Sequence, residues 1–282
     1  MDLMTPATDR ASNDYHYFIR GRLPEWDECL AQLDARSIDA RNRFYHHADL
    51  AYGEFERQKL DIFPAKIETV KPPILLFIHG GYWRMMDKSQ FSFIAPAFQK
   101  KGVTVALANY RLLGDVSLKA IVDDVKQATK WLLQHADSYG FDRTRLVICG
   151  HSAGAHLAAH AALDNKVVSG LAGVSGVYDL EPIRNSFLND IEFLDEETVA
   201  RLGSKSLIPN KGCRALFAYG RQEGTEFARQ SELQTKNWQH QEHSVEQLKL
   251  DANHATSVAQ LGDSDSPLFN AVLRIICRSG EA

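Results

Sequence analysis

The chain has few cysteines and no long hydrophobic run, and both shortages narrow the classes to which it can belong. Its four cysteines, Cys29, Cys149, Cys213 and Cys277, share neither a disulfide nor a metal-binding spacing. We therefore expect reduced thiols and a cytoplasmic protein. The longest apolar stretches, such as residues 74–78 (ILLFI), are too short to cross a bilayer. The polar N-terminus lacks the apolar segment of a secretory signal, so we expect no membrane partner.

An excess of positive charge and the common nucleotide-binding motifs are missing as well. The formal net charge is -4, whereas a nucleic-acid-binding protein usually presents a basic face, so we expect no nucleic-acid partner. No P-loop occurs, and residues 170–176 (GLAGVSG) do not have the spacing of a dinucleotide-binding loop. The sequence therefore implies no cofactor.

What remains is the composition of a soluble globular protein, with 44% hydrophobic and 24% charged residues. The length is within the range of one large α/β domain, so we predict a single domain over residues 1–282. Residues 1–58 are predicted to form a helical N-terminal extension, because residues 25–43 carry apolar side chains at helical spacing. Residues 181–210 are polar and helix-prone, which suggests a small helical cap over the site. The sequence does not indicate an oligomeric state, and a dimer is one of the states compatible with it.

Short apolar runs alternate with longer amphipathic stretches from residue 58 onward. The runs typical of strands cover residues 58–63, 74–80, 103–110, 145–150, 170–178, 215–220 and 245–250. Helical patterns cover residues 89–102, 117–139, 152–163 and 268–277. Because strands that alternate with helices form βαβ units, we predict an α/β fold, with a mostly parallel central sheet and helices on both faces.

Residues 150–154 (GHSAG) match the G-x-S-x-G motif of a serine nucleophile. A predicted strand precedes the motif and a predicted helix follows it, which is the context in which a sharp turn exposes the serine hydroxyl. We therefore predict that Ser152 is a nucleophile. The alternative is a small-residue turn between two buried elements.

A second glycine-containing loop, residues 79–83 (HGGYW), ends the apolar run of residues 74–78. Glycines there let backbone N–H groups point into a cavity, as an oxyanion hole requires. The expected donors are Gly80, Gly81 or Tyr82, together with Ala153 after the nucleophile. Tyr82 and Trp83 are expected on the leaving-group side of the substrate pocket, although Trp83 packed beneath the loop is the alternative.

Eleven histidines are present, and His254 alone follows the last predicted strand. This position completes the chain order serine, acid, histidine used by α/β hydrolases, so we predict that His254 is the general base. His79 and His151 are expected to support their loops. His156 and His160 form H-x-x-x-H, but the glutamate of the zinc motif is absent, so we predict no metal site.

The acid of a Ser-His-acid arrangement is expected after the run at residues 215–220. No aspartate occurs in that turn, so Glu223 or Glu226 is expected to serve, because glutamate can orient an imidazole as aspartate does. Asp179 and Asp251 are the alternatives, and a solvated surface side chain is the structural alternative for Glu223.

Several motifs together resemble the arylformamidase, or kynurenine formamidase, branch of the α/β-hydrolase superfamily. They are HGGYW, GHSAG, and residues 110–112 (YRL), 175–183 (SGVYDLEPI) and 226–231 (EFARQS). The resemblance covers roughly residues 50–275 and implies the α/β-hydrolase fold. In the family the acid lies three residues before the Glu-Phe pair of the last motif, which corresponds to Glu223 here, where the family usually has aspartate.

The sequence thus predicts a serine hydrolase that cleaves a small acyl group, of formyl or acetyl type, from an aryl amide or ester through an acyl-enzyme. The resemblance makes N-formyl-L-kynurenine the first candidate substrate, and Arg111 a candidate partner for its carboxylate unless that arginine is structural. A general short-chain carboxylesterase is the main alternative. A lipase would need a more apolar lid than residues 181–210, and an inactive binding protein of the same fold is the alternative from another class.

Overall fold

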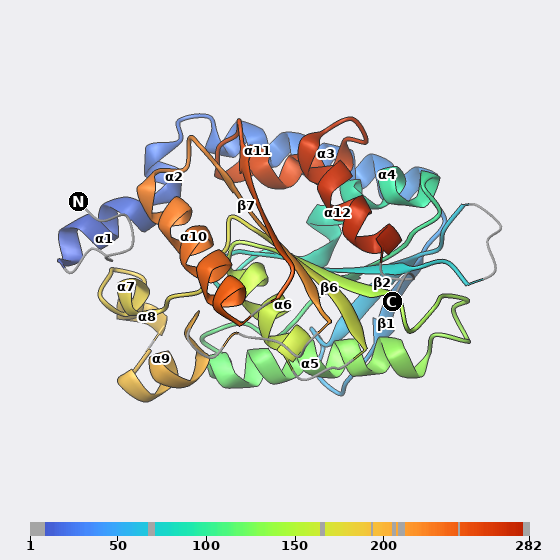
Figure 1. Cartoon of the computed structure of the whole chain (residues 1–282), viewed down its shortest axis with the longest axis horizontal. Coiled ribbons are helices and arrows are strands. Elements are labelled where there is room, and N and C mark those ends of the chain that lie inside the picture. The colour runs from blue at the N-terminus through green and yellow to red at the C-terminus, as the bar shows by residue number, and fades with distance from the viewer. Residues whose placement is uncertain are drawn as a thin grey trace.

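The computed structural model describes residues 9–66, 71–163, 167–192, 194–204, 207, 212–241 and 243–278. Within these residues, eight strands form one sheet in the order β1-β2-β4-β3-β5-β6-β7-β8 (Figure 1). The strands are β1 (His47–Ala51), β2 (Lys59–Phe63), β3 (Ile74–Ile78), β4 (Thr104–Ala108), β5 (Leu146–His151), β6 (Val168–Val174), β7 (Arg214–Gly220) and β8 (Val245–Leu250). Strands β3 to β8 are mutually parallel, whereas β1 and β2 form an antiparallel edge.

Helices cover both faces of this sheet (Figure 1). The longer ones are α3 (Trp26–Arg43), α5 (Leu118–Gln134), α6 (Ala153–Leu163), α10 (Thr225–His240) and α12 (Pro267–Arg278). The shorter ones are α1 (Arg10–Tyr17), α2 (Ile19–Arg22), η1 (Lys88–Ile94), α4 (Ala95–Lys100), α7 (Glu181–Arg184), α8 (Asn189–Glu192), α9 (Glu196–Leu202), α11 (His254–Ala259) and η3 (Gln260–Gly262). The prediction of an α/β fold with a mostly parallel sheet is confirmed.

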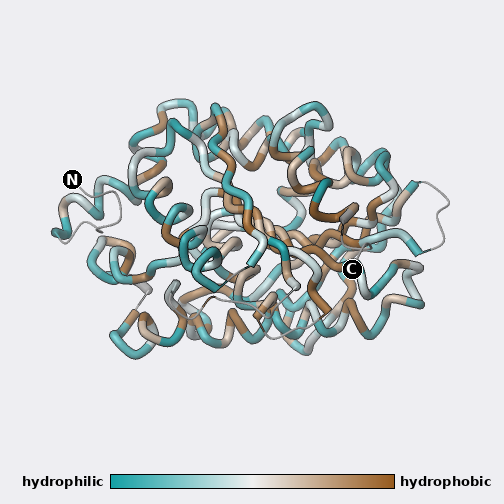
Figure 2. Tube along the Cα trace, viewed as in Figure 1, coloured by the Kyte–Doolittle hydropathy of each residue, from teal (hydrophilic) through white to brown (hydrophobic). Residues whose placement is uncertain are grey.

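The apolar run of β3 shows why the sheet is buried on both faces. Successive side chains of a strand point to opposite faces, so a strand covered on both sides must be apolar throughout. Ile74, Leu76 and Ile78 pack into the hydrophobic cluster that contains α5 and α6, whereas Leu75 and Phe77 pack into the cluster that contains α4 and α12. In Figure 2 the hydrophobic colour accordingly gathers along the central strands.

The structure corrects several of the predicted elements. The helix predicted over residues 89–102 is a 3₁₀ segment, η1, followed by α4, which begins at Ala95. Pro96 lies in its first turn, where proline is favoured. The helix predicted over residues 117–139 ends at Gln134, and the strand predicted over 170–178 ends at Val174. The polar edge strand β1 escaped detection because it lacks an apolar alternation, so residues 1–58 are not wholly helical.

Helices α1 and α7 lie against each other at one end of the sheet (Figure 1). Arg10 pairs with Asp190, and Asn13 donates to the carbonyl of Asn185 at 3.2 Å. Three short helices, α7 to α9, occupy the described part of the predicted cap. Parts of the predicted segments, residues 1–8, 193, 205–206 and 208–210, lie outside the described residues.

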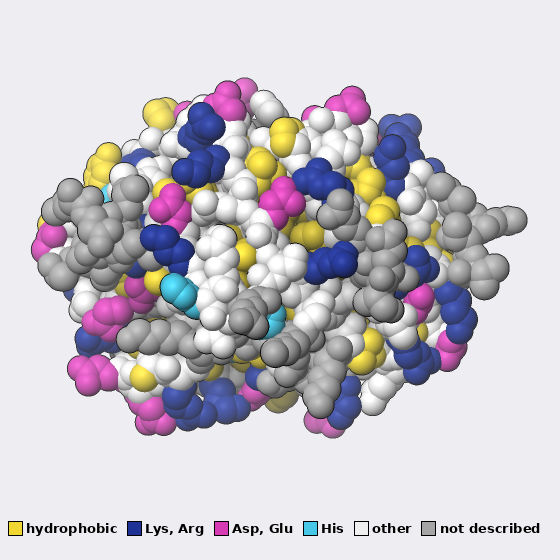
Figure 3. Space-filling view, in the orientation of Figure 1, with side chains coloured by type: hydrophobic (Ala, Val, Ile, Leu, Met, Phe, Trp, Pro, Cys, Tyr) yellow, Lys and Arg dark blue, Asp and Glu magenta, His cyan; other side chains and the backbone are white. Residues whose placement is uncertain are grey.

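The surface carries charges of both signs. Lysine and arginine side chains alternate with acidic ones over the face shown in Figure 3, as the small net charge of -4 suggests. Of the helices that the structure describes, none combines the length and the apolar character needed to span a membrane.

Candidate active site

Ser152 lies at the sharp turn between β5 and α6. Its φ of 56° is in the left-handed region, which is sparsely populated by residues with a side chain and is common at functional sites. Its N–H donates to the carbonyl of Val174 at 2.8 Å. A Cβ on Gly150 would lie 2.1 Å from the Gly154 carbonyl oxygen, and one on Gly154 would lie 2.2 Å from that of Ile78. The turn therefore requires both glycines, because backbone approaches too closely for any side chain.

Glu223 and His254 form a buried pair at the ends of β7 and β8. Glu223 Oε2 accepts from His254 Nδ1 at 2.9 Å, and the two side chains are 0% and 3% exposed. His254 begins α11, whose N-terminus is capped by the side chain of Asn253. The other carboxylate oxygen, Glu223 Oε1, accepts from Gly220 N–H at 2.6 Å. A buried carboxylate on Nδ1 holds the imidazole in the tautomer that leaves Nε2 free to accept a proton.

The other three candidate acids have different partners in the described part of the chain. Glu226 accepts from Arg229 through both oxygens, at 2.7 and 2.8 Å. Arg229 also donates to Asp179 at 3.0 Å. Asp251 is exposed and accepts from Gln222 at 3.2 Å. Of these carboxylates, Glu223 is the one that contacts His254.

His151 joins the serine turn to the histidine loop. Its Nε2 donates to the carbonyl oxygen of His254 at 3.0 Å, and the two rings lie 4.7 Å apart. Burial lowers the pKa of His151 well below its usual value, so the ring is neutral and its single N–H is used in this bond. Because Ser152 follows directly in the chain, the bond holds the start of α11 beside the serine.

The loop of residues 79–83 lies directly against the serine. A Cβ on Gly80 would be 3.0 Å from the Cβ of Ser152 and 2.9 Å from the carbonyl oxygen of His151. The φ angles of Gly81, Tyr82 and Trp83 are 97°, 48° and 59°, all in the left-handed region. The loop is thus a tight, strained turn at the carboxyl ends of β3 and β5.

Tyr110 fixes the orientation of the first two peptide groups of that loop. Its hydroxyl donates to the carbonyls of His79 and Gly80 at 2.9 and 3.1 Å, and its ring stacks on His79 at 4.3 Å. Burial lowers the pKa of His79 to about 4, so this ring is neutral too. The N–H of a trans peptide points opposite to its carbonyl, so the N–H groups of Gly80 and Gly81 point away from Tyr110.

The two aromatic residues of the loop point in different directions. Trp83 is 0% exposed, and its ring meets His156 edge-on at 5.4 Å, so it packs beneath the loop and does not line an open pocket. This corrects its expected place beside the leaving group. Tyr82 is partly buried, and its hydroxyl donates to the carbonyl of Tyr17 at 2.8 Å.

The remaining candidates have structural partners. His156 and His160 both donate from Nε2 to the carbonyl of Leu202, at 2.7 and 3.0 Å. No group of three or more His, Cys, Asp or Glu side chains suited to a metal ion occurs among the described residues. Arg111 donates to both oxygens of Asp124, at 2.9 and 2.6 Å. It therefore has the structural role that was the alternative to binding a substrate carboxylate.

The N-terminal segment covers this site. The indole of Trp26 is stacked 6.4 Å from the His254 ring, and Phe227 lies 4.5 Å from the same ring. Ile19 and Leu23, together with Glu223 and His254, line a cavity of about 10 Å³, which is room for about one water molecule. Ser152 and His254 are each 3% exposed, so the site is closed in this conformation.

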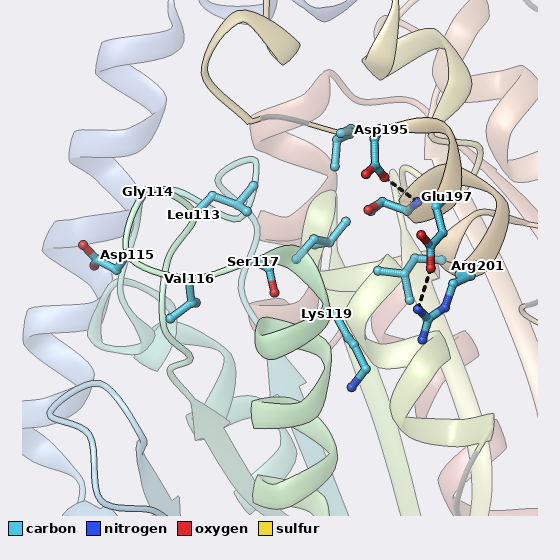
Figure 4. Close-up of a pocket in the computed structure, with 13 residues that line it drawn as sticks. Leu113, Gly114, Asp115, Val116, Ser117, Lys119, Asp195, Glu197 and Arg201 are labelled. Atoms are coloured by element: carbon cyan, nitrogen blue, oxygen red, sulfur yellow. Dashed lines mark hydrogen bonds and ion pairs between the residues drawn. The ribbon is translucent and has the colours of Figure 1, made fainter.

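A larger cavity, of about 560 Å³, lies elsewhere (Figure 4). It is bounded by residues 113–119, which lead into α5, and by the side chains of α9. Its two basic side chains are paired, Arg201 with Glu197 at 3.1 Å and Lys119 with Asp123 at 2.6 Å. Neither Ser152 nor His254 lines it, so its size does not identify the reaction site.

The chain is similar to several known proteins. The BD-FAE family model matches residues 60–252. A kynurenine formamidase of Salmo salar is 28% identical over 249 residues, which cover 82% of each chain. The esterase LipC of Mycobacterium tuberculosis is 28% identical over 179 residues, or 56% of this chain and 44% of the esterase. A crystal structure from Silicibacter sp. TM1040 superposes with a TM-score of 0.81 at 24% identity, covering 92% of this chain and 98% of the other.

Proposed function

The chain belongs to the BD-FAE family and is a serine hydrolase of the arylformamidase or esterase type with an α/β-hydrolase fold, and on this premise we propose that Ser152, His254 and Glu223 form its catalytic triad. One observation carries the proposal. The buried 2.9 Å contact is between His254 Nδ1 and Glu223 Oε2, and His151, the neighbour of the serine in the left-handed turn between β5 and α6, binds the His254 carbonyl. This arrangement of nucleophile, base and orienting carboxylate is the one that acyl transfer requires.

In the proposed reaction Ser152 Oγ attacks the carbonyl carbon of the substrate while His254 Nε2 takes the hydroxyl proton. The tetrahedral intermediate collapses, and His254 returns that proton to the leaving amine or alcohol, which leaves an acyl-enzyme. A water molecule then attacks the acyl-enzyme, with His254 again taking and returning the proton, to release the acid and the free serine. Glu223 stays ionised and stabilises the imidazolium in both steps.

The oxyanion of this intermediate is proposed to accept from backbone N–H groups of Gly80, Gly81 or Tyr82 and from Ala153. Support comes from the close approach of Gly80 to Ser152 and from the carbonyls that Tyr110 holds on the opposite side of the loop. Ala153 begins α6, so its N–H lies at a helix N-terminus, where the helix dipole favours negative charge. Removing one such donor from a hydrolase typically costs about 10²- to 10³-fold in kcat.

We propose a substrate with a formyl or acetyl group on an aryl amine or aryl alcohol, and N-formyl-L-kynurenine as the first candidate. The similarity to the kynurenine formamidase of Salmo salar supports a short acyl group. Tyr82 is the aromatic side chain proposed to contact the leaving group. A general short-chain carboxylesterase is the second candidate, which the similarity to the esterase LipC favours.

The experiment that tests the substrate is a comparison of kcat/KM for formyl, acetyl, butyryl and octanoyl esters of one phenol, with N-formylkynurenine alongside. We expect a fall with chain length, because an ill-fitting methylene costs about 1–3 kcal/mol in a closed pocket. A rise toward octanoyl would assign a lipase-like specificity. A good acetyl ester rate without formylkynurenine turnover would make the chain a general esterase.

We also propose a cytoplasmic location, with a single domain in which the segment of α7 to α9 caps the site. The four cysteines are free, and burial raises the pKa of the Cys213 thiol to about 12, as suits a thiol that packs as a small hydrophobic side chain. The contacts of Arg10 with Asp190 and of Asn13 with Asn185 support a cap joined to the N-terminal helices. Measuring the location of a tagged chain in fractionated cells tests the first point.

A further inference from the structure

A buried serine outside the proposed triad has an unusual conformation. Ser175 directly follows β6, is 0% exposed, and has a φ of 51°, in the left-handed region. Its N–H donates to the carbonyl of Ala218 in the neighbouring strand β7 at 2.7 Å. A residue with a side chain keeps such a backbone only where surrounding contacts impose it, and such residues gather at functional sites.

The hydroxyl of Ser175 contacts the proposed acid. Its Oγ lies 2.6 Å from Glu223 Oε1 and 2.8 Å from the hydroxyl oxygen of Ser257. An ionised carboxylate only accepts, so Ser175 must donate to Glu223. Ser257 Oγ also donates to the His254 carbonyl at 3.1 Å, because a carbonyl oxygen accepts a second hydrogen bond beside that from His151. The Ser175 proton therefore points toward the carboxylate.

This hydrogen bond acts on the oxygen that does not face the histidine. Glu223 Oε1 receives Ser175 and the N–H of Gly220, both at 2.6 Å, while Oε2 receives His254 Nδ1. A glutamate has one more rotatable bond than the aspartate usual in the resembling family, so its carboxylate needs an extra constraint to face the imidazole. Fixing Oε1 from two directions fixes the plane of the carboxylate, and hence the direction of Oε2.

We propose that Ser175 is a positioning residue that holds the Glu223 carboxylate against His254. The inference rests on the proposed triad. A hydrogen bond to a charged group contributes enough to change a rate by about 10- to 100-fold, so removing the Ser175 hydroxyl is expected to lower kcat by that factor. KM is expected to change less than twofold, because the hydroxyl contacts Glu223 and not the substrate.

The test compares Ser175→Ala with Ser175→Gly on an aryl acetate. Both variants lack the hydroxyl, but glycine relieves the left-handed backbone at φ 51° and alanine does not. Equal losses of kcat are expected from the two, with the glycine variant the more stable. Ser257→Ala keeps the Ser175 hydroxyl and is expected to lose less activity than the Ser175 variants. It is measured in their place if neither of them folds. Ser37→Ala is the matched control, since Ser37 is 1% exposed, donates at 2.7 Å to Gln90, and should affect stability alone.

Combining Ser175→Ala with Glu223→Gln separates the two proposals. If Ser175 acts through Glu223, its substitution should have little further effect on kcat once the carboxylate is replaced. Two results would overturn the positioning role and leave the proposed triad intact. One is an equal loss of kcat in both backgrounds. The other is a Ser175→Ala kcat within threefold of wild type while Glu223→Gln loses most of its activity. A Glu223→Gln enzyme with nearly full kcat overturns the triad itself.

Discussion

Replacing Glu223 by glutamine removes one acceptor from the proposed triad while leaving the size of the side chain unchanged. The new amide has one oxygen, which accepts, and one NH₂ group, which only donates. The N–H of Gly220, 2.6 Å from Glu223 Oε1, cannot face an NH₂ group, so the amide oxygen must occupy the Oε1 position. Ser175 is satisfied by the same oxygen. The NH₂ group is then left facing His254 Nδ1.

This orientation forces the imidazole of His254 into the opposite tautomer. Nδ1 must accept from the amide, so the ring proton moves to Nε2, and Nε2 can no longer take the proton of Ser152. The same change of tautomer in a serine protease costs about 10⁴-fold in kcat, and we expect a loss of this order here, or about 5 kcal/mol of transition-state stabilisation. KM should change little, because Glu223 is buried behind the histidine.

The assay is kcat for an aryl acetate, with thermal unfolding measured in parallel. Glu226→Gln is the matched control, because Glu226 is equally buried but pairs with Arg229 and accepts from Tyr17 at 2.7 Å. That variant should lose stability, by about 1–3 kcal/mol, and keep kcat within a few-fold of wild type. A Glu223→Gln enzyme with kcat within tenfold of wild type would refute the reasoning, as would a greater sensitivity at Glu226 or Asp251.

Three further predictions follow from the site and the loops around it. Ser152→Ala should lower kcat more than 1000-fold and abolish labelling by a fluorophosphonate, with unchanged unfolding, because alanine meets the φ of 56° as serine does; retained turnover would indicate another nucleophile. Burial lowers the pKa of His79 to about 4, so this side chain is protonated more readily in the unfolded chain than in the folded one. The free energy of unfolding should therefore fall by about 3 kcal/mol as the pH falls from 6.5 to 4. Urea unfolding of wild type and of His79→Asn should differ in this pH dependence. EDTA should leave activity unchanged, because His156 and His160 use Nε2 to bind the Leu202 carbonyl; a loss restored by zinc would contradict this.

Features encoded in neighbouring residues were readable from the sequence. The unbroken apolar run of β3 indicated a strand covered on both faces, because side chains alternate along a strand. The glycines at 150 and 154 placed Ser152 at a strand-to-helix turn, and its left-handed φ is what such a turn imposes. His254 was singled out by its place after the last strand. Each of these signals depends on residues close in the chain.

Contacts between residues far apart in the chain were decided only by the tertiary structure. Four carboxylates suited the sequence pattern, and Glu223 meets His254, whereas Arg229 binds Glu226 and Asp179. A tryptophan in a loop reads the same whether it faces a pocket or the core, and the burial of Trp83 became apparent only with its neighbours in place. The covering of His254 by Trp26 depends on the path of the N-terminal helices across the sheet. Local periodicity determines which segments are strands and helices, whereas pairing of buried polar groups depends on which of them the packed elements bring within hydrogen-bonding distance.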